Sequence, residues 1–140
     1  MLSLLESVSY FEVPGPYGVK GSTVSFLDRS GTVRTKTDSK HGKTFAHAVR
    51  WAAQIAEVPR IGKGAGVVVS VVFGFPRPTG RDRGRLSPCV RPDVDKLARA
   101  LLDALTGVAY DDDGQVVALS VRKVYALHTV AQVTIQADPA

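Results

Sequence analysis

The sequence contains one cysteine, Cys89, one tryptophan and no long apolar run. A single cysteine cannot form an internal disulfide, which is typical of a reducing compartment, so we expect a cytoplasmic protein. The longest apolar stretch, residues 67–73, is interrupted by Ser70 and is too short to cross a bilayer. The first residues lack the basic flank of a secretion signal. These absences argue against a disulfide scaffold and against a membrane partner.

The size and composition indicate one globular domain. The chain has 140 residues, of which 44% are hydrophobic and 22% charged, with no repeat and no linker. Alternating or β-branched segments predict strands at residues 8–13, 23–27, 32–35, 67–75, 116–123 and 129–136. Apolar residues at helical spacing within 45–56 and 97–108 predict two helices, the second of which Gly107 is placed to end. We therefore predict an α/β (α+β) fold over residues 1–140, with about five strands in a mixed sheet and two main helices packed on it.

The charge is unevenly distributed. The net charge is +5, and residues 1–91 hold fourteen basic side chains against six acidic ones. Residues 93–113 reverse this balance, with six aspartates against Lys96 and Arg99. A basic body with one acidic segment suits a protein that holds phosphates over its surface and a divalent metal at one place. The alternative is that these aspartates only cap a helix and form a turn.

A basic loop is expected at about residues 76–91. It is rich in arginine, proline and glycine, so it cannot contribute a packed core, and we expect it to be mobile without a ligand. On the first predicted helix, Trp51 is expected in the core or at a groove edge rather than stacked on bases.

The spacing of Asp93 and Asp95 points both side chains the same way if the segment is extended. Pro92 favours extended backbone before it, and the apolar stripe of the second helix begins only at Leu97. Both aspartates are therefore expected in the lead and first turn of that helix, where its N-terminus offsets part of their repulsion.

Arg99 is bracketed by acidic residues. Asp95, Arg99 and Asp103 are spaced by four, which aligns them on the polar face of one helix. One interpretation is a surface ion-pair ladder, in which each link contributes at most about 1 kcal/mol. The other is an arginine held beside a reaction centre.

Other site types do not fit. The run of residues 111–114 lacks the alternate aspartates and terminal glutamate of a calcium-binding EF-hand loop. The sequence has no zinc-type cysteine and histidine spacing, no Walker-type phosphate loop and no nucleophile-elbow motif.

Three ordered segments resemble the signature of the RusA-type Holliday-junction resolvases: Arg91-Pro92-Asp93-Val94-Asp95-Lys96-Leu97, Asp103-Ala104-Leu105-Thr106-Gly107 and Asp112-Asp113-Gly114-Gln115-Val116. The resemblance implies a homodimer that cuts four-way DNA junctions with a divalent metal held by Asp93, Asp95 and Asp113. Mg²⁺, or Mn²⁺, is the ion expected for carboxylate ligands. Asp103 and Asp112 are expected to support the site without binding the ion.

Two positions depart from that signature. Arg99 stands where the family has a catalytic lysine; arginine can hold a phosphate oxygen but cannot act as a general acid at neutral pH. Lys96 stands where many members have asparagine. We expect Arg99 to stabilise transition-state charge and Lys96 to contact DNA, with the replacement for the family's lysine left open between them.

DNA backbone contacts are expected from basic residues, which read shape more than sequence: Lys20, Arg77, Arg81, Arg83, Arg85, Arg91 and Lys96. The sequence therefore predicts a Mg²⁺-dependent endodeoxyribonuclease that resolves four-way junctions by paired nicks in recombination and repair. Two alternatives remain open at this point. One is a flap or branched-DNA nuclease without junction preference, and the other is a non-catalytic nucleic-acid-binding module.

Overall fold

The computed structural model describes residues 7–19, 23–37 and 41–139. Its centre is a mixed four-stranded sheet in the order β1-β6-β4-β5, formed by Val8–Pro14, Val130–Ala137, Val67–Phe75 and Val116–Tyr125. The central strand β4 runs antiparallel to β6 and parallel to β5, while β1 is antiparallel to β6. The predicted mixed sheet is therefore confirmed, and predicted and observed strand bounds differ by at most two residues at either end.

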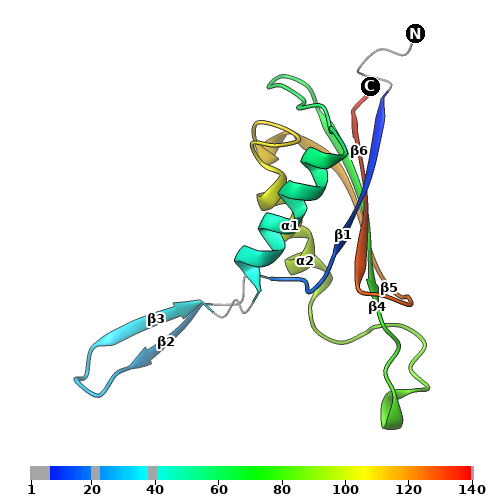
Figure 1. The fold of residues 1–140 in the computed structure, drawn as a ribbon. Helices are drawn as coiled ribbons and strands as arrows, with labels where there is room; N and C mark the ends of the chain where they lie inside the picture. The colour runs from blue at the N-terminus through cyan, green and yellow to red at the C-terminus, as the bar shows by residue number, and fades with distance from the viewer. Residues whose placement is uncertain (1–6, 20–22, 38–40, 140) are drawn as a thin grey trace.

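Both helices, α1 (Gly42–Ile55) and α2 (Val94–Leu105), cover the same face of this sheet (Figure 1). Alternate residues of β4 are fully buried beneath them, whereas those between are only partly buried. An apolar run such as that of β4 is typical of a strand buried on both faces, but here the two helices share one side of the sheet and leave the other face only partly buried. The core joins the inward residues of the sheet to the apolar stripes of the helices, including Val49 of α1 and Leu101 of α2.

The remaining two strands, β2 (Thr23–Leu27) and β3 (Val33–Thr37), pair only with each other. They form a two-stranded ribbon that projects away from the rest of the molecule (Figure 1). The expected sheet of about five strands is thus four strands plus a separate hairpin. Two short 3₁₀ turns complete the fold, η1 (Gly80–Asp82) and η2 (Asp113–Gln115). In the described part of the chain, no helix is long and apolar enough to span a membrane.

Candidate functional site

Asp93 and Asp95 lie at the start of α2. Asp93 is the residue before the helix and has extended backbone, with φ −70° and ψ 143°, while Asp95 lies in the first turn. This agrees with the geometry expected from Pro92 and the apolar stripe. Asp93 does not cap the helix through its side chain, and both aspartates are exposed. Asp95 makes no hydrogen bond or ion pair with any residue that the structure describes.

Lys123, near the end of β5, fixes the segment that carries these aspartates. Its ammonium donates to the carbonyl oxygens of Val90 at 2.6 Å and Pro92 at 2.9 Å. No sequence signal points to this role, since Lys123 only marks the end of a predicted strand. A hollow of about 280 Å³ lies beside it, lined by Cys89 and Val94 among others. The backbone that leads to Asp93 is therefore anchored to the sheet.

The two basic residues of α2 differ in their contacts. The Lys96 ammonium lies 3.5 Å from the Asp93 carboxylate, in a pair that is about half exposed. Because solvent screens such a pair, it adds little to stability. Arg99 is exposed and makes no ion pair with Asp95, so the predicted ladder does not form at that link. Among the residues that the structure describes, none is shown to bind the Arg99 guanidinium, which is therefore accessible to an anion.

The arginines of the predicted basic loop surround the same end of the molecule. Arg77, Arg81, Arg83 and Arg91 are exposed, and Arg85 is partly exposed with its guanidinium 3.3 Å from Asp82. Arg77 lies with its guanidinium carbon 5.1 Å from the ring centroid of Tyr125, a cation–π contact at the base of the loop. The Tyr125 hydroxyl is buried and has no hydrogen-bond partner within the described ranges of the chain. Lys20, the other predicted DNA contact, lies outside the described residues.

The second acidic segment is a turn that leads into β5. Asp111 accepts hydrogen bonds from Arg60 Nε at 2.6 Å and from the backbone N–H of Lys63 at 3.0 Å. The hydrogen bond from Arg60 is the main reason that the pKa of Asp111 lies below its usual value. Asp112 accepts from the backbone N–H of Gly114 and so caps η2, which also lowers its pKa. These two aspartates have structural roles, as the capping-and-turn interpretation proposed.

Gln115 locks this turn to the loop that follows α1. Its Oε1 accepts from the backbone N–H groups of Asp111 and Asp112, both at 2.9 Å. Its Nε2 donates to the carbonyl oxygens of that loop: Ile61, Gly62 and Ala65, at 2.9–3.2 Å. The glutamine of the motif is thus an organiser of the turn. Asp113, at the start of η2, remains exposed.

Tyr110 packs beneath the turn and donates its hydroxyl to the carbonyl of Leu102 at 2.7 Å. Burial raises its pKa well above the usual range, and the charges of Asp113 and Asp103 add to this shift. Asp103 is partly buried near the C-terminal end of α2. The charges of Asp103 and Asp113 therefore both act on the Tyr110 hydroxyl.

One chain does not bring Asp113 to Asp93 and Asp95. Lys123, which contacts Pro92, pairs with Phe73 at the carboxyl end of β4, whereas Val116, three residues after Asp113, pairs with Val67 at its amino end. Six residues of strand separate these pairs by about 20 Å. Among residues 7–19, 23–37 and 41–139, no three carboxylate, imidazole or thiol groups are placed to hold a metal ion.

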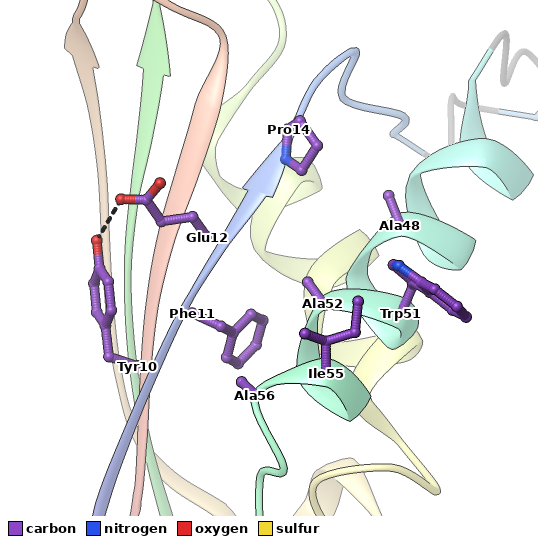
Figure 2. A pocket seen from close by; sticks show the side chains of 9 residues that line it. All are labelled: Tyr10, Phe11, Glu12, Pro14, Ala48, Trp51, Ala52, Ile55 and Ala56. Carbon is purple, nitrogen blue, oxygen red and sulfur yellow. Dashed lines mark hydrogen bonds between the residues drawn. The ribbon is translucent and has the colours of Figure 1, made fainter.

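A groove of about 350 Å³ lies elsewhere, between β1 and α1 (Figure 2). Phe11 points from β1 toward α1, and Trp51 lies at the groove edge with 61% of its surface exposed. Of the described residues that line it, only Glu12 is acidic, and it accepts a hydrogen bond from Tyr10 at 2.9 Å. This groove has the character of an apolar crevice and lacks the carboxylate set of a metal centre.

This chain is similar to a known protein family and to a curated protein. Residues 16–136 match the family model described as endodeoxyribonuclease RusA. A stretch of 55 residues is 40% identical to an uncharacterized protein, YqaN, of Bacillus subtilis (strain 168). That stretch makes up 39% of this chain and 39% of the relative. The family match spans the first turn of α2, the arginine loop and the turn that holds Asp113.

Proposed function

The chain belongs to the RusA endodeoxyribonuclease family, whose members act on Holliday junctions, and from this premise we propose that it resolves four-way DNA junctions with a divalent metal. The observation that carries the proposal is the state of Asp93 and Asp95. Both are exposed at the start of α2, and Asp95 has no internal partner among the described residues. Exposed carboxylates at the start of a helix, next to a loop of arginines, suit a cation and a phosphate.

The donor set fits Mg²⁺, which prefers carboxylate and water oxygens. Asp93 and Asp95 would hold the ion, and Asp113 would complete its ligands. When bound, Mg²⁺ lowers the pKa of a coordinated water and neutralises charge on the phosphate. Arg99, one helical turn after Asp95, would hold a non-bridging phosphate oxygen, and Lys123 would keep the backbone before Asp93 in place.

Because Asp113 lies about one length of α2 from Asp95, we propose that it acts on the other copy in a homodimer. The helix has 12 residues, which corresponds to about 18 Å. In a two-fold dimer, the Asp113 end of each chain would face the Asp95 end of its partner, so each metal site would draw on both copies. Two such sites on one face would suit paired nicks in opposed strands.

A mixing experiment tests the shared site. Asp95→Asn and Asp113→Asn are each expected to abolish cutting of a labelled four-way junction in Mg²⁺. When the two variants are refolded together, a mixed dimer keeps one intact site only if Asp113 acts across the dimer. We expect nicking to return to about a quarter of the wild-type site number, since half of the dimers are mixed and each has one working site. No recovery in dimers shown to have mixed would exclude the shared site.

The substrate and the chemistry are tested with a junction, a flap and a linear duplex, each with and without Mg²⁺. Paired symmetric nicks in the junction support a resolvase. Cutting of every branched form supports the broader nuclease. The non-catalytic binding module is favoured by one observation, the lack of a three-ligand group within the described part of a single chain. Tight junction binding without cutting at several pH values, with Mg²⁺ and with Mn²⁺, would establish that alternative.

A further inference from the structure

The ribbon of β2, β3 and their connecting turn, residues 23–37, is here called the arm. Its strands pair only with each other, and Figure 1 shows it standing clear of the sheet and both helices. Its strands of five residues each extend about 17 Å. Gly18, before the arm, lies so close to the backbone of His41, after it, that a β-carbon at Gly18 would overlap the His41 carbonyl. The arm thus leaves and rejoins the body at one point.

The tip of the arm is ordered by its own polar contacts. Asp28 accepts hydrogen bonds from the backbone N–H groups of Ser30 and Thr32 and from Arg34 Nε at 2.6 Å. Gly31 takes φ +81°, the left-handed conformation that a three-residue hairpin turn requires. Hydrogen bonds from the Ser30 side chain and from Arg34 lower the pKa of Asp28 to about 2, so these contacts persist at neutral pH. The tip is therefore a shaped end rather than a loose loop.

Two apolar side chains are exposed at this tip. Leu27 and Val33 are directly paired across the two strands, so they lie on the same face of the ribbon. Their side chains are 69% and 66% exposed, because a short hairpin on its own has no core in which to bury them. A paired apolar edge at the end of a projecting ribbon has the form of a wedge.

Charge indicates what this wedge meets. Arg29 is exposed at the tip, and Arg34 stands beside Val33 with 66% of its side chain exposed. Within the arm, residues 23–37, three lysines and arginines stand against one aspartate. A basic ribbon with an apolar end suits DNA, whose backbone binds the cations while its opened base steps accept apolar side chains.

We propose that the arm binds one of the four duplexes of the junction and inserts Leu27 and Val33 between bases at the branch point. The arm starts from the end of the molecule that carries the candidate site, since the Tyr17 hydroxyl, near its base, donates to the carbonyl of Gly74 at the end of β4 at 2.6 Å. Base pairs at a branch point have lost stacking on one side, so a wedge opens them at lower cost than those within a duplex. The arm would thereby favour branched over linear DNA. This inference rests on the proposed DNA substrate but not on cutting.

The experiment uses a four-way junction with 2-aminopurine at the branch point and EDTA to prevent cutting. Opening of the base stack raises 2-aminopurine fluorescence. We expect wild-type protein to raise it on the junction, and Leu27→Thr with Val33→Thr to reduce that rise about five-fold with little change in affinity, because the contacts removed are to bases rather than to phosphates. Val8→Thr is the matched control, since Val8 is a 57% exposed valine on a strand of the main sheet. Threonine keeps the strand preference at all three positions.

A separate variant tests the charged part of the arm. Arg29→Gln is expected to weaken binding and to lower the slope of log K against log salt by about one. The wedge is overturned if the double variant opens the junction as fully as wild type, if Val8→Thr loses the signal equally, or if wild type raises no fluorescence while bound. If the junction is opened but never cut in Mg²⁺, the proposed nuclease fails while the wedge stands.

Discussion

Aspartates at the two ends of β4 have different roles. At the amino end of β4, Asp111 and Asp112 are bound to a guanidinium or to backbone N–H groups and order the turn before β5. At its carboxyl end, Lys123 organises the backbone, and Asp95 is left without an internal partner among the described residues. A run of like charges therefore divides into residues that fold the chain and residues left to meet something outside it.

The largest expected effect is on cutting activity, and it distinguishes the aspartates that bind an ion from those that fold the chain. Asp95→Asn should lower junction cutting by at least about a hundred-fold, because it removes a metal ligand, while DNA affinity stays the same or rises. Cutting rates and binding isotherms measure the two quantities on one labelled junction. Glu57→Gln is the control, since Glu57 is exposed and far from α2 in sequence. Normal cutting by Asp95→Asn would remove this residue from the site.

The second largest expected effect is on the stability of the fold, and it comes from the acidic turn at the amino end of β4. Gln115→Ala should lower the free energy of unfolding by about 2 kcal/mol, since Gln115 bridges the acidic turn and the loop after α1 through several hydrogen bonds. Urea unfolding measures the change. Gln54→Ala, at an exposed position of α1, should change it by less than about 0.5 kcal/mol. Equal stability of the two variants would mean that the turn does not need its glutamine.

Lys123→Met tests whether the candidate site needs the backbone before Asp93 to be held by the sheet. The variant loses the hydrogen bonds to Val90 and Pro92, so Asp93 should be held less well. We expect cutting to fall about ten-fold, with about 1 kcal/mol lost from stability. Arg122→Met removes the same charge from the neighbouring, exposed residue and should leave stability unchanged. Full activity in Lys123→Met would show that Asp93 finds its position without this anchor.

The smallest effect is the acid response of the turn. The folded pKa of Asp111 lies below the unfolded value of 3.8, so its contribution is present above about pH 4 and is lost as pH falls through the folded pKa. Asp111→Asn should flatten the fall in melting temperature between about pH 5 and pH 3. Asp95→Asn, tested alongside, should leave that slope closer to wild type. An unchanged slope in Asp111→Asn would mean that the Arg60 contact does not contribute in solution.

The sequence predicted most of the fold because the signals were local. The β-branched residues of β4 and the apolar stripe of α2 placed both elements, and Pro92 placed Asp93 before its helix. The same reasoning reached the structural roles of the acidic turn only as an alternative. Nothing local marked the partners of that turn, since Gln115 reaches carbonyl groups about fifty residues earlier in the chain.

The separation of Asp113 from Asp95 was also beyond local reasoning. Motif spacing orders residues along the chain, but whether they meet depends on the direction of α2 relative to β5 and on how copies assemble. The separation of the arm from the main sheet was not predicted for a similar reason. Alternation of residues predicts a strand but does not indicate which sheet that strand joins. Assignment of Asp93, Asp95 and Asp113 to one metal centre remains a prediction.

Gly18 and His41 meet at the base of the arm, and the strands between them share no ladder with the main sheet. Replacing the hairpin at its base, where Gly18 and His41 meet, would therefore disturb few hydrogen bonds of the main sheet and helices. If the arm holds DNA as proposed, shortening the ribbon, or exchanging it for one of different length and charge, would alter which DNA shapes are bound while the rest of the fold is kept. The hairpin is thus a natural cassette for redesigning substrate choice.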